Sequence, residues 1–182
     1  MRLLAAVQRV CADFEQREID LTAFLDRCTR LVTSTVGCSR AGIWVFQGEP
    51  SALRLRCLAM YDATRDRMTH VPDEEGPSVA DYFMALEQTG HVTATDARTH
   101  FATRGFFGQG LDVNNVKSLL AAAVSVNGRL YGAFTCTQVG SEQEWSRQQL
   151  ASLRLIGSRV SLALANSDRS ATETQPALLG LR

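Results

Sequence analysis

Residues 118–136 read SLLAAAVSVNGRLYGAFTC, and this stretch decides the fold. Two apolar runs flank the pair Asn127–Gly128, a strong hairpin signal because both residues tolerate the positive φ of a type I′ turn. Both runs are apolar on nearly every residue, which indicates strands that are covered on both faces. The stretch therefore predicts the central hairpin of an antiparallel sheet in an α+β domain.

Two further strands are expected before this hairpin. Residues 41–46 form an apolar run, and residues 53–60 begin by alternating apolar and charged side chains. The polar stretch 47–51 between them predicts a turn, so that the two strands form a second antiparallel hairpin. Residues 92–94 predict a brief additional strand.

The segment 62–77 predicts a loop, because it contains two prolines and a glycine beside the acidic run Asp73–Glu75. We interpret the acidic run as solvated, since a cation site would need further carboxylates at ligand spacing. Ser78 then predicts the N-cap of a short helix, with Asp81 three residues later as an acidic variant of the capping box.

Three longer helices are predicted outside the strands. An apolar stripe at spacings of three and four over residues 3–17 predicts an amphipathic N-terminal helix. Asp20 predicts the N-cap of a second helix over residues 21–36. A capping box that begins at Ser146 predicts a third helix from residue 147 to about residue 166.

Charge and composition exclude several classes of protein. Lys plus Arg and Asp plus Glu both total 19 in 182 residues, which indicates no surface for nucleic acid or anionic membranes. No apolar run approaches the ~20 residues of a membrane-spanning helix, and the N-terminus lacks the pattern of a signal peptide. The five cysteines are scattered, so we expect neither a disulfide framework nor a metal site. A cytoplasmic protein is expected.

Four spaced stretches share motifs with one family; they span Tyr82–Leu86, Asp96–Phe106, Ser118–Val124 and Gly128–Ser146. Over roughly residues 20–166 the chain resembles a GAF domain, a small-molecule sensory module, of the subgroup found in bacterial sensor histidine kinases and diguanylate cyclases. The resemblance implies a GAF-like α+β fold. Its central antiparallel sheet would carry the N- and C-terminal helices on one face and a segment of loop and short helix on the other.

This resemblance divides the chain into three parts. Residues 1–18 form the N-terminal amphipathic helix, residues 19–166 the GAF-like sensory domain, and residues 167–182 a flexible C-terminal tail.

The chain departs from the subgroup at four positions. Ala121 and Ala123 stand where the subgroup usually has Asp and Pro, and Thr137 and Gln138 replace a Glu-His pair. A buried charge persists only when it is paired, so the joint loss of these groups removes the charged part of any buried network.

The resemblance implies a ligand site under the segment 70–115, for a ligand or cofactor that the sequence does not identify. Aromatic walls with a few polar groups are typical of such sites. The candidates are Trp44, Tyr61, Tyr82, Phe83, Asp96, Phe107 and Ser118. The alternative is that the aromatic rings fill an ordinary core with no cavity. We expect no catalytic or metal-binding residues, and no cysteine lies in the segment where bilin-binding members attach their chromophore.

The first and last helices predict a second site, the seam of a homodimer. The apolar side chains assigned to it are Val7, Val10, Phe14, Val160 and Leu164. The alternative is that the N-terminal helix packs on the sheet of its own chain.

These features favour a non-catalytic sensory or regulatory domain of bacterial signal transduction, of two-component or cyclic-di-GMP type. It would bind a small molecule, dimerise, or both, and so control a kinase or cyclase output partner. No kinase or cyclase motif occurs in the 182 residues, so we expect the output in a separate protein or elsewhere in a larger one. One alternative is a degenerate GAF fold that serves only for interaction or dimerisation. Another is a GAF-type redox enzyme, which would need a reactive cysteine.

Overall fold

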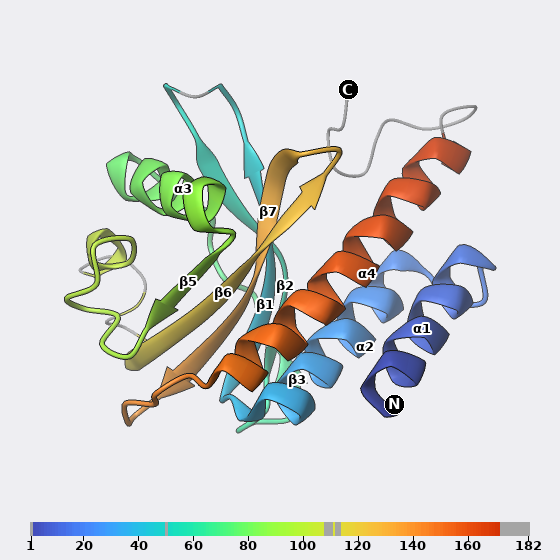
Figure 1. Cartoon of the computed structure of the whole chain (residues 1–182), viewed down its shortest axis with the longest axis horizontal. Coiled ribbons are helices and arrows are strands. Elements are labelled where there is room, and N and C mark those ends of the chain that lie inside the picture. Colours follow the sequence, from blue (N-terminus) through green and yellow to red (C-terminus); the bar gives the residue numbers. More distant parts are fainter. Residues whose placement is uncertain (1, 50, 108–110, 112–113, 172–182) are drawn as a thin grey trace.

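The computed structural model describes residues 2–49, 51–107, 111 and 114–171. Its strands form one antiparallel sheet in the order β3-β2-β1-β7-β6-β5, with β4 paired to β2 (Figure 1). The strands are β1 (Arg40–Gln47), β2 (Arg54–Asp62), β3 (Arg67–Met68), β4 (Glu74–Glu75), β5 (His91–Ala94), β6 (Val116–Val126) and β7 (Arg129–Val139).

The predicted hairpin is confirmed as β6 and β7. Asn127 and Gly128 connect the two strands with φ angles of 52° and 78°, the left-handed region that a type I′ turn requires. β7 also pairs with β1, and β6 pairs with β5, so the hairpin lies inside the sheet and both of its faces are buried. The hairpin formed by β1 and β2 is confirmed as well.

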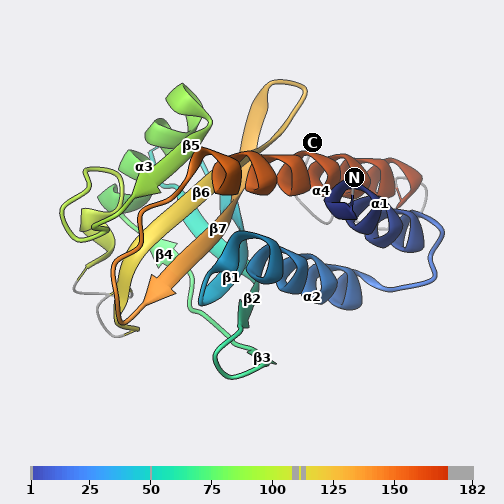
Figure 2. The same cartoon turned by 60° about the horizontal axis from the view of Figure 1, so that its bottom comes forward.

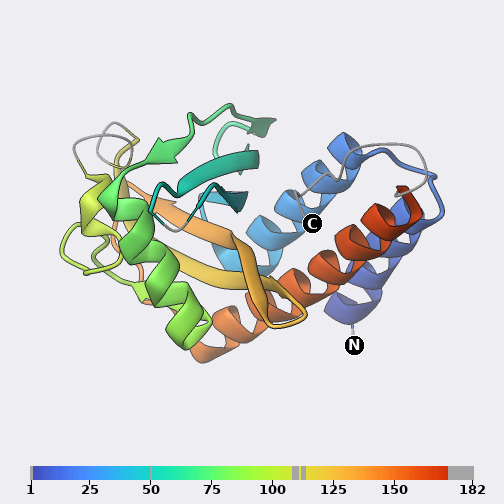
Figure 3. The ribbon, with the colours of Figure 1, turned by 90° about the horizontal axis from the view of Figure 1, so that it is seen from above.

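The helices lie on both faces of the sheet. They are α1 (Arg2–Glu15), α2 (Leu21–Val32), α3 (Pro77–Thr89) and α4 (Arg147–Ala171), with a π-helical turn at Thr33–Gly37 and a 3₁₀ turn at Arg104–Phe106. Figure 2 shows α1, α2 and α4 together on one side, and Figure 3 shows α3 on the opposite side. The prediction that the terminal helices cover one face of the sheet and the short-helix segment covers the other is therefore confirmed. No helix among the described residues is long and apolar enough to cross a membrane.

Helix ends test the predicted caps. The Asp20 carboxylate accepts a 2.8 Å hydrogen bond from the Ala23 amide, and Ser146 and Gln149 exchange the two bonds of a capping box. The prediction for Ser78 is wrong, because α3 begins at Pro77 and its N-cap is Gly76, two residues before Ser78. Proline is favoured at the first helical position, where its missing N–H costs nothing.

The side chains assigned to a dimer seam are used inside the chain instead. Val7 and Val160 are completely buried, and Phe14 and Leu164 are 7% and 3% exposed. Phe14 stacks on Phe24 of α2 at 4.2 Å between ring centroids. Their assignment to a dimer surface is wrong for this packing, and the alternative of packing within the chain describes it.

The structure also bears on both predicted limits of the domain, residues 19 and 166. Val10 is half-buried against the same core as the other α1 residues, so α1 packs as part of the domain. At the other end α4 continues to Ala171, past the predicted limit at residue 166. The remainder of the predicted flexible tail, residues 172–182, lies outside the described residues.

Two apolar cores result from this arrangement. One lies between the sheet and the layer of α1, α2 and α4. The other lies between the opposite sheet face, α3 and the chain after β5, and it includes the buried side chains of Trp44, Met60, Tyr82, Phe106 and Leu119. The second core is incompletely filled, and the candidate site lies there.

Candidate functional site

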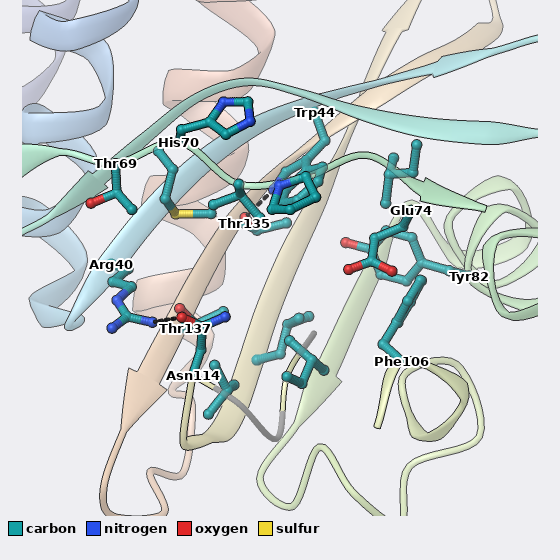
Figure 4. A pocket seen from close by; sticks show the side chains of 17 residues that line it. Arg40, Trp44, Thr69, His70, Glu74, Tyr82, Phe106, Asn114, Thr135 and Thr137 are labelled. Atoms are coloured by element: carbon teal, nitrogen blue, oxygen red, sulfur yellow. Dashed lines mark hydrogen bonds between the residues drawn. The ribbon is translucent and has the colours of Figure 1, made fainter. Parts of the chain in front are cut away.

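A cavity of about 120 Å³ lies between the sheet and the segments that cover it on the side of α3 (Figure 4). Its floor comes from β1, β2, β6 and β7, and its rim from residues 69–72 and 74, from α3, and from Phe106, Leu111 and Asn114. The lining residues are Arg40, Trp44, Leu55, Met60, Thr69, His70, Val71, Pro72, Glu74, Tyr82, Phe106, Leu111, Asn114, Val116, Leu119, Thr135 and Thr137.

Three aromatic side chains from different elements give the cavity its walls. Trp44 on β1, Tyr82 on α3 and Phe106 in the 3₁₀ turn are 8%, 2% and 5% exposed. Tyr82 and Phe106 meet edge to face, with 5.6 Å between ring centroids and an interplanar angle of 84°. The Trp44 indole Nε1–H donates a 3.1 Å hydrogen bond to Thr135 Oγ1, which fixes the ring against the sheet.

An ion pair marks one end of the cavity. Arg40 Nε donates a 2.9 Å hydrogen bond to Asp62, and Arg40 Nη1 donates a 3.4 Å bond to Asn114 Oδ1. Burial by itself would raise the pKa of Asp62, but hydrogen bonds from Thr64 and Arg40 outweigh burial and hold that pKa below its usual value. Thr137 lies opposite Arg40 in the β1–β7 register.

Two polar atoms at the cavity have no partner among the described residues. The hydroxyl oxygens of Tyr82 and Thr69 are buried and make no hydrogen bond. Burial raises the pKa of the Tyr82 phenol, so that the hydroxyl keeps its proton at neutral pH. An unpaired buried hydroxyl costs about 1–3 kcal/mol, and native proteins seldom leave such groups unexplained.

The cavity brings together two of the seven predicted pocket residues, Trp44 and Tyr82. Tyr61 lies on the opposite face of the sheet, where the guanidinium of Arg30 covers its ring at 4.3 Å and its hydroxyl donates to Asp66. Its placement in the pocket is therefore wrong. Phe83 points elsewhere, toward Phe46 in an edge-to-face contact at 4.9 Å.

The other three predicted residues stabilise loops. Asp96 accepts hydrogen bonds from the Arg98 amide and the Thr99 hydroxyl, both at 2.9 Å, which is a capping role. Ser118 donates to the Thr95 carbonyl and accepts from the Gln143 amide, so it ties two loops to β6. Phe107 is half-buried, 5.3 Å from the Arg98 guanidinium. None of the three lines the cavity.

Several lining residues are not among the predicted ones, and Glu74 is the most informative of them. The sequence predicts a solvated acidic loop here, whereas Glu74 forms part of β4, is half-buried and lines the cavity. Burial raises the pKa of its carboxyl. Phe106 lines the cavity in place of its predicted neighbour Phe107. Thr137 stands out in the sequence only as a departure from the subgroup, which usually has a glutamate there, and Arg40 gives no signal beyond its position before an apolar strand.

No cysteine is among the residues that line the cavity. All five are free thiols, and Cys11, Cys28, Cys38 and Cys136 are buried. Burial raises the pKa of Cys11 to about 11 and that of Cys57 to about 12, and the pKa values of Cys28 and Cys136 are also raised. These thiols are protonated at neutral pH and therefore poor nucleophiles. Within the described part of the chain no cluster of His, Cys, Asp and Glu could hold a metal ion.

Comparisons with known proteins agree with this architecture. The family model described as "GAF domain" matches residues 20–164. The structure is similar to the phycoerythrobilin-bound GAF domain from a cyanobacterial phytochrome, with a TM-score of 0.71 and 15% identity over 93% of this chain and 98% of that chain. It is also similar to the blue-light absorbing form of the PixJ GAF domain of Thermosynechococcus elongatus, with a TM-score of 0.68 and 16% identity over 89% and 97% of the two chains.

A third similar structure is the chromophore-binding domain of Stigmatella aurantiaca phytochrome P1, with a TM-score of 0.63 and 14% identity. That alignment covers 89% of this chain and 59% of the other. No curated protein matches the sequence. At these identities the likeness extends to the fold alone.

Proposed function

Since this chain belongs to the GAF domain family, we propose that it is a non-catalytic sensory domain that binds a small molecule in the cavity beneath α3. Its signal would control an output partner of bacterial signal transduction, a kinase or a cyclase, in line with the subgroup that its motifs resemble. Catalysis would then lie in the partner.

The unpartnered Tyr82 hydroxyl carries this proposal. The side chain is 2% exposed and lines the cavity, yet its oxygen has no hydrogen-bond partner among the described residues. A bound molecule with a polar group at this point would remove the cost of burying an unpaired hydroxyl, about 1–3 kcal/mol. A fold that served only for protein interaction would leave this hydroxyl, and that of Thr69, unexplained.

A covalently bound bilin does not fit the residues present. The similar structures named above include a bilin-bound domain, but no cysteine is among the residues that line this cavity. The cavity measures about 120 Å³, whereas sites for drug-sized ligands measure about 300–1,000 Å³. A much smaller ligand is proposed.

Strand β6 offers a physical route from the cavity to the terminal helices. Val116 and Leu119 on one face of β6 line the cavity. Leu120 and Ala122 on the other face belong to the core that β6 shares with α4. A ligand that favours one packing of β6 would bias the position of α4, provided that it binds the two packings with different affinity.

Dimerisation belongs to the same proposal, on surfaces other than the buried seam. Leu4 on α1 and Leu162 on α4 are the large apolar side chains that the described part of these helices exposes, at 36% and 53%.

Thr137 bears on the identity of the ligand. In the subgroup that the sequence resembles, this position usually carries a glutamate, and Thr137 lines the cavity here. The proposed ligand therefore differs from one that such a glutamate would hold.

Native mass spectrometry of freshly purified protein tests the proposal. We expect additional mass on the wild-type chain and less of it on Tyr82→Phe, which lacks the hydroxyl at the cavity. Tyr131→Phe is the matched control, because Tyr131 lies on β7 outside the cavity and should keep the additional mass. A second measurement follows the NMR resonance of the Trp44 indole while a small-molecule extract of bacteria is added. The proposal would be contradicted if the wild-type protein carried no additional mass and this resonance also stayed unchanged.

A further inference from the structure

Glu74 is an unusual carboxylate in the wall of the cavity. The two-residue strand β4 pairs with β2, where Glu74 lies opposite Leu55, and β4 also contacts α3, which carries Tyr82. Figure 4 shows Glu74 and Tyr82 toward the same end of the cavity, away from Arg40. The backbone pairing therefore holds an acidic side chain against an apolar site instead of leaving it in solvent.

Glu74 differs from its two acidic neighbours in having no counter-charge. Asp73 and Glu75 both form ion pairs with Arg54. The Glu74 carboxylate makes no ion pair or side-chain hydrogen bond within the described part of the chain, although it is half-buried. Withdrawing an unpaired carboxylate from water is unfavourable, and burial accordingly raises its pKa.

Two other ionisable side chains line the cavity in the described part of the chain, those of His70 and Arg40. Of these, the Arg40 guanidinium carries a permanent positive charge. Arg40 is already paired with Asp62, whose side chain is completely buried. This ion pair contributes no net charge, so Glu74 makes the cavity wall electronegative. An anionic ligand would be repelled by Glu74 and would have to compete with Asp62 for Arg40.

The aromatic walls favour the same sign of charge. The faces of Trp, Tyr and Phe rings carry negative electrostatic potential and attract cations, by about 0.5–2 kcal/mol for each contact. Trp44, Tyr82 and Phe106 surround the cavity together with Glu74. A carboxylate beside aromatic rings is the chemistry that recognises organic ammonium groups.

We propose that the ligand of this cavity is a small organic ammonium compound, whose N–H groups donate to the Glu74 carboxylate and to Tyr82 Oη while its apolar part lies against Trp44 and Phe106. This inference rests on the proposed function and names the chemical class of the ligand. The volume of about 120 Å³ is slightly smaller than the ~150 Å³ of a cavity that holds benzene. The enclosed part of the ligand therefore has at most about six non-hydrogen atoms, the number in benzene.

Three probes of nearly equal shape and different charge test the inference. Isobutylammonium, isobutanol and isobutyrate share a branched carbon skeleton and carry a positive, a neutral and a negative head group. Binding of each to the full chain is measured by titration of the Trp44 indole resonance in NMR spectra. We expect the ammonium probe to bind at least tenfold more tightly than the alcohol, and the carboxylate to bind most weakly.

Two neighbouring substitutions identify the residue responsible. Glu74→Gln should weaken binding of isobutylammonium at least tenfold and leave binding of isobutanol unchanged. Glu75→Gln is the matched control, because Glu75 follows Glu74 in β4 but pairs with Arg54 outside the cavity. It should change neither affinity. Unfolding midpoints of both variants confirm that each is folded before the titrations are compared.

The outcomes separate the inference from the proposed function. If the alcohol or the carboxylate binds as tightly as the ammonium probe, or if Glu74→Gln and Glu75→Gln have equal effects, the ammonium class is wrong while the cavity remains a ligand site. If none of the three probes shifts the Trp44 resonance at tens of millimolar, the ammonium inference fails, and the extract experiment above then decides the proposed function by itself.

Discussion

Arg40 Nε donates a 2.9 Å hydrogen bond to the carboxylate of Asp62, whose side chain is completely buried. The two residues are partners in the β1–β2 register, and Arg40 lies at the end of the cavity opposite Tyr82 (Figure 4). Thr64 completes the site, because its amide and hydroxyl donate to the second carboxylate oxygen at 3.0 Å and 2.6 Å. Both oxygens of the buried carboxylate thus accept hydrogen bonds from the protein.

Asp62→Asn should strongly destabilise the fold. The substitution leaves the guanidinium of Arg40, which is 13% exposed, without a counter-charge, and breaking a largely buried pair from one side costs about 3 kcal/mol. Urea unfolding measures the loss as a lower midpoint. Asp13→Asn is the control, because its partner Arg27 is 47% exposed and a surface pair contributes less than about 1 kcal/mol. Equal losses in the two variants would contradict this account.

The same carboxylate predicts how stability depends on acid. The pKa of Asp62 is lower in the folded chain than the ordinary value of about 3.9 for an unfolded one. The folded state therefore favours the ionised form, and its contribution is fully present above about pH 4 and is lost as pH falls through the folded pKa. The free energy of unfolding, measured between pH 6 and pH 2.5, should fall less steeply in Asp62→Asn than in the wild type. Parallel curves would be inconsistent with this assignment.

Tyr82→Phe should leave the ligand-free protein as stable as the wild type, or stabilise it by up to about 1 kcal/mol. The hydroxyl makes no hydrogen bond to any described residue, so its removal should lose no hydrogen bond and should relieve the cost of burying a polar group. Most substitutions of buried residues destabilise, which makes the expected sign diagnostic. The comparison requires protein that native mass spectrometry shows to be free of ligand. A loss of more than 1 kcal/mol in such protein would mean that the hydroxyl has a structural partner.

Local signals explain which parts of the fold could be predicted. The turn at Asn127–Gly128 and the cap at Asp20 depend on residues within a few positions of one another, and both were correct. Gly132 is different. A side chain there would collide with the backbone carbonyl of Trp44 on the neighbouring strand, a close approach that only the pairing of β7 with β1 creates. No pattern near Gly132 reveals it.

The error at Tyr61 has a specific cause in β2. Leu55 and Cys57 face the cavity side, and simple alternation from them would place Tyr61 there too. The β1–β2 register shifts between Ile43 and Trp44, so Leu58 is an extra residue in β2. Such a bulge reverses the faces of the residues that follow it. Met60 consequently lines the cavity, and Tyr61 turns to the helix layer.

The remaining cavity residues depend on contacts between distant segments. Glu74 reaches the site because residues 74–75 pair with β2 after a loop, and no periodicity in a run of two residues predicts such a pairing. Phe106 and Phe107 are adjacent and chemically identical, and only the 3₁₀ turn decides that Phe106 points inward. The family resemblance therefore suggests a candidate site under residues 70–115, but neither it nor the sequence patterns could select the side chains that line the cavity.

The packing of the terminal helices gives a last prediction, which separates folding from dimerisation. Val160 is completely buried among α1, α2 and the sheet, so Val160→Ala should cost about 2 kcal/mol by removing methyl groups and leaving a cavity. Because the contacts lie within one chain, this loss should be the same at 1 µM and at 100 µM protein, as urea unfolding can measure. Stability linked to a dimer depends on protein concentration. A loss that grows with concentration would restore Val160 to a dimer seam.

Leu162 is the control for this prediction and tests the proposed dimer surface. It lies two residues away on α4 and is 53% exposed within one chain. Leu162→Ala should change the free energy of unfolding by less than about 0.5 kcal/mol at low concentration, as for most surface substitutions. If the exposed face of α4 associates with a second copy, the same variant should weaken that association, which analytical ultracentrifugation measures directly. Val160→Ala should thus affect folding, and Leu162→Ala should affect association. If the two variants changed folding stability and association equally, the division of α4 into an inner and an outer face would be contradicted.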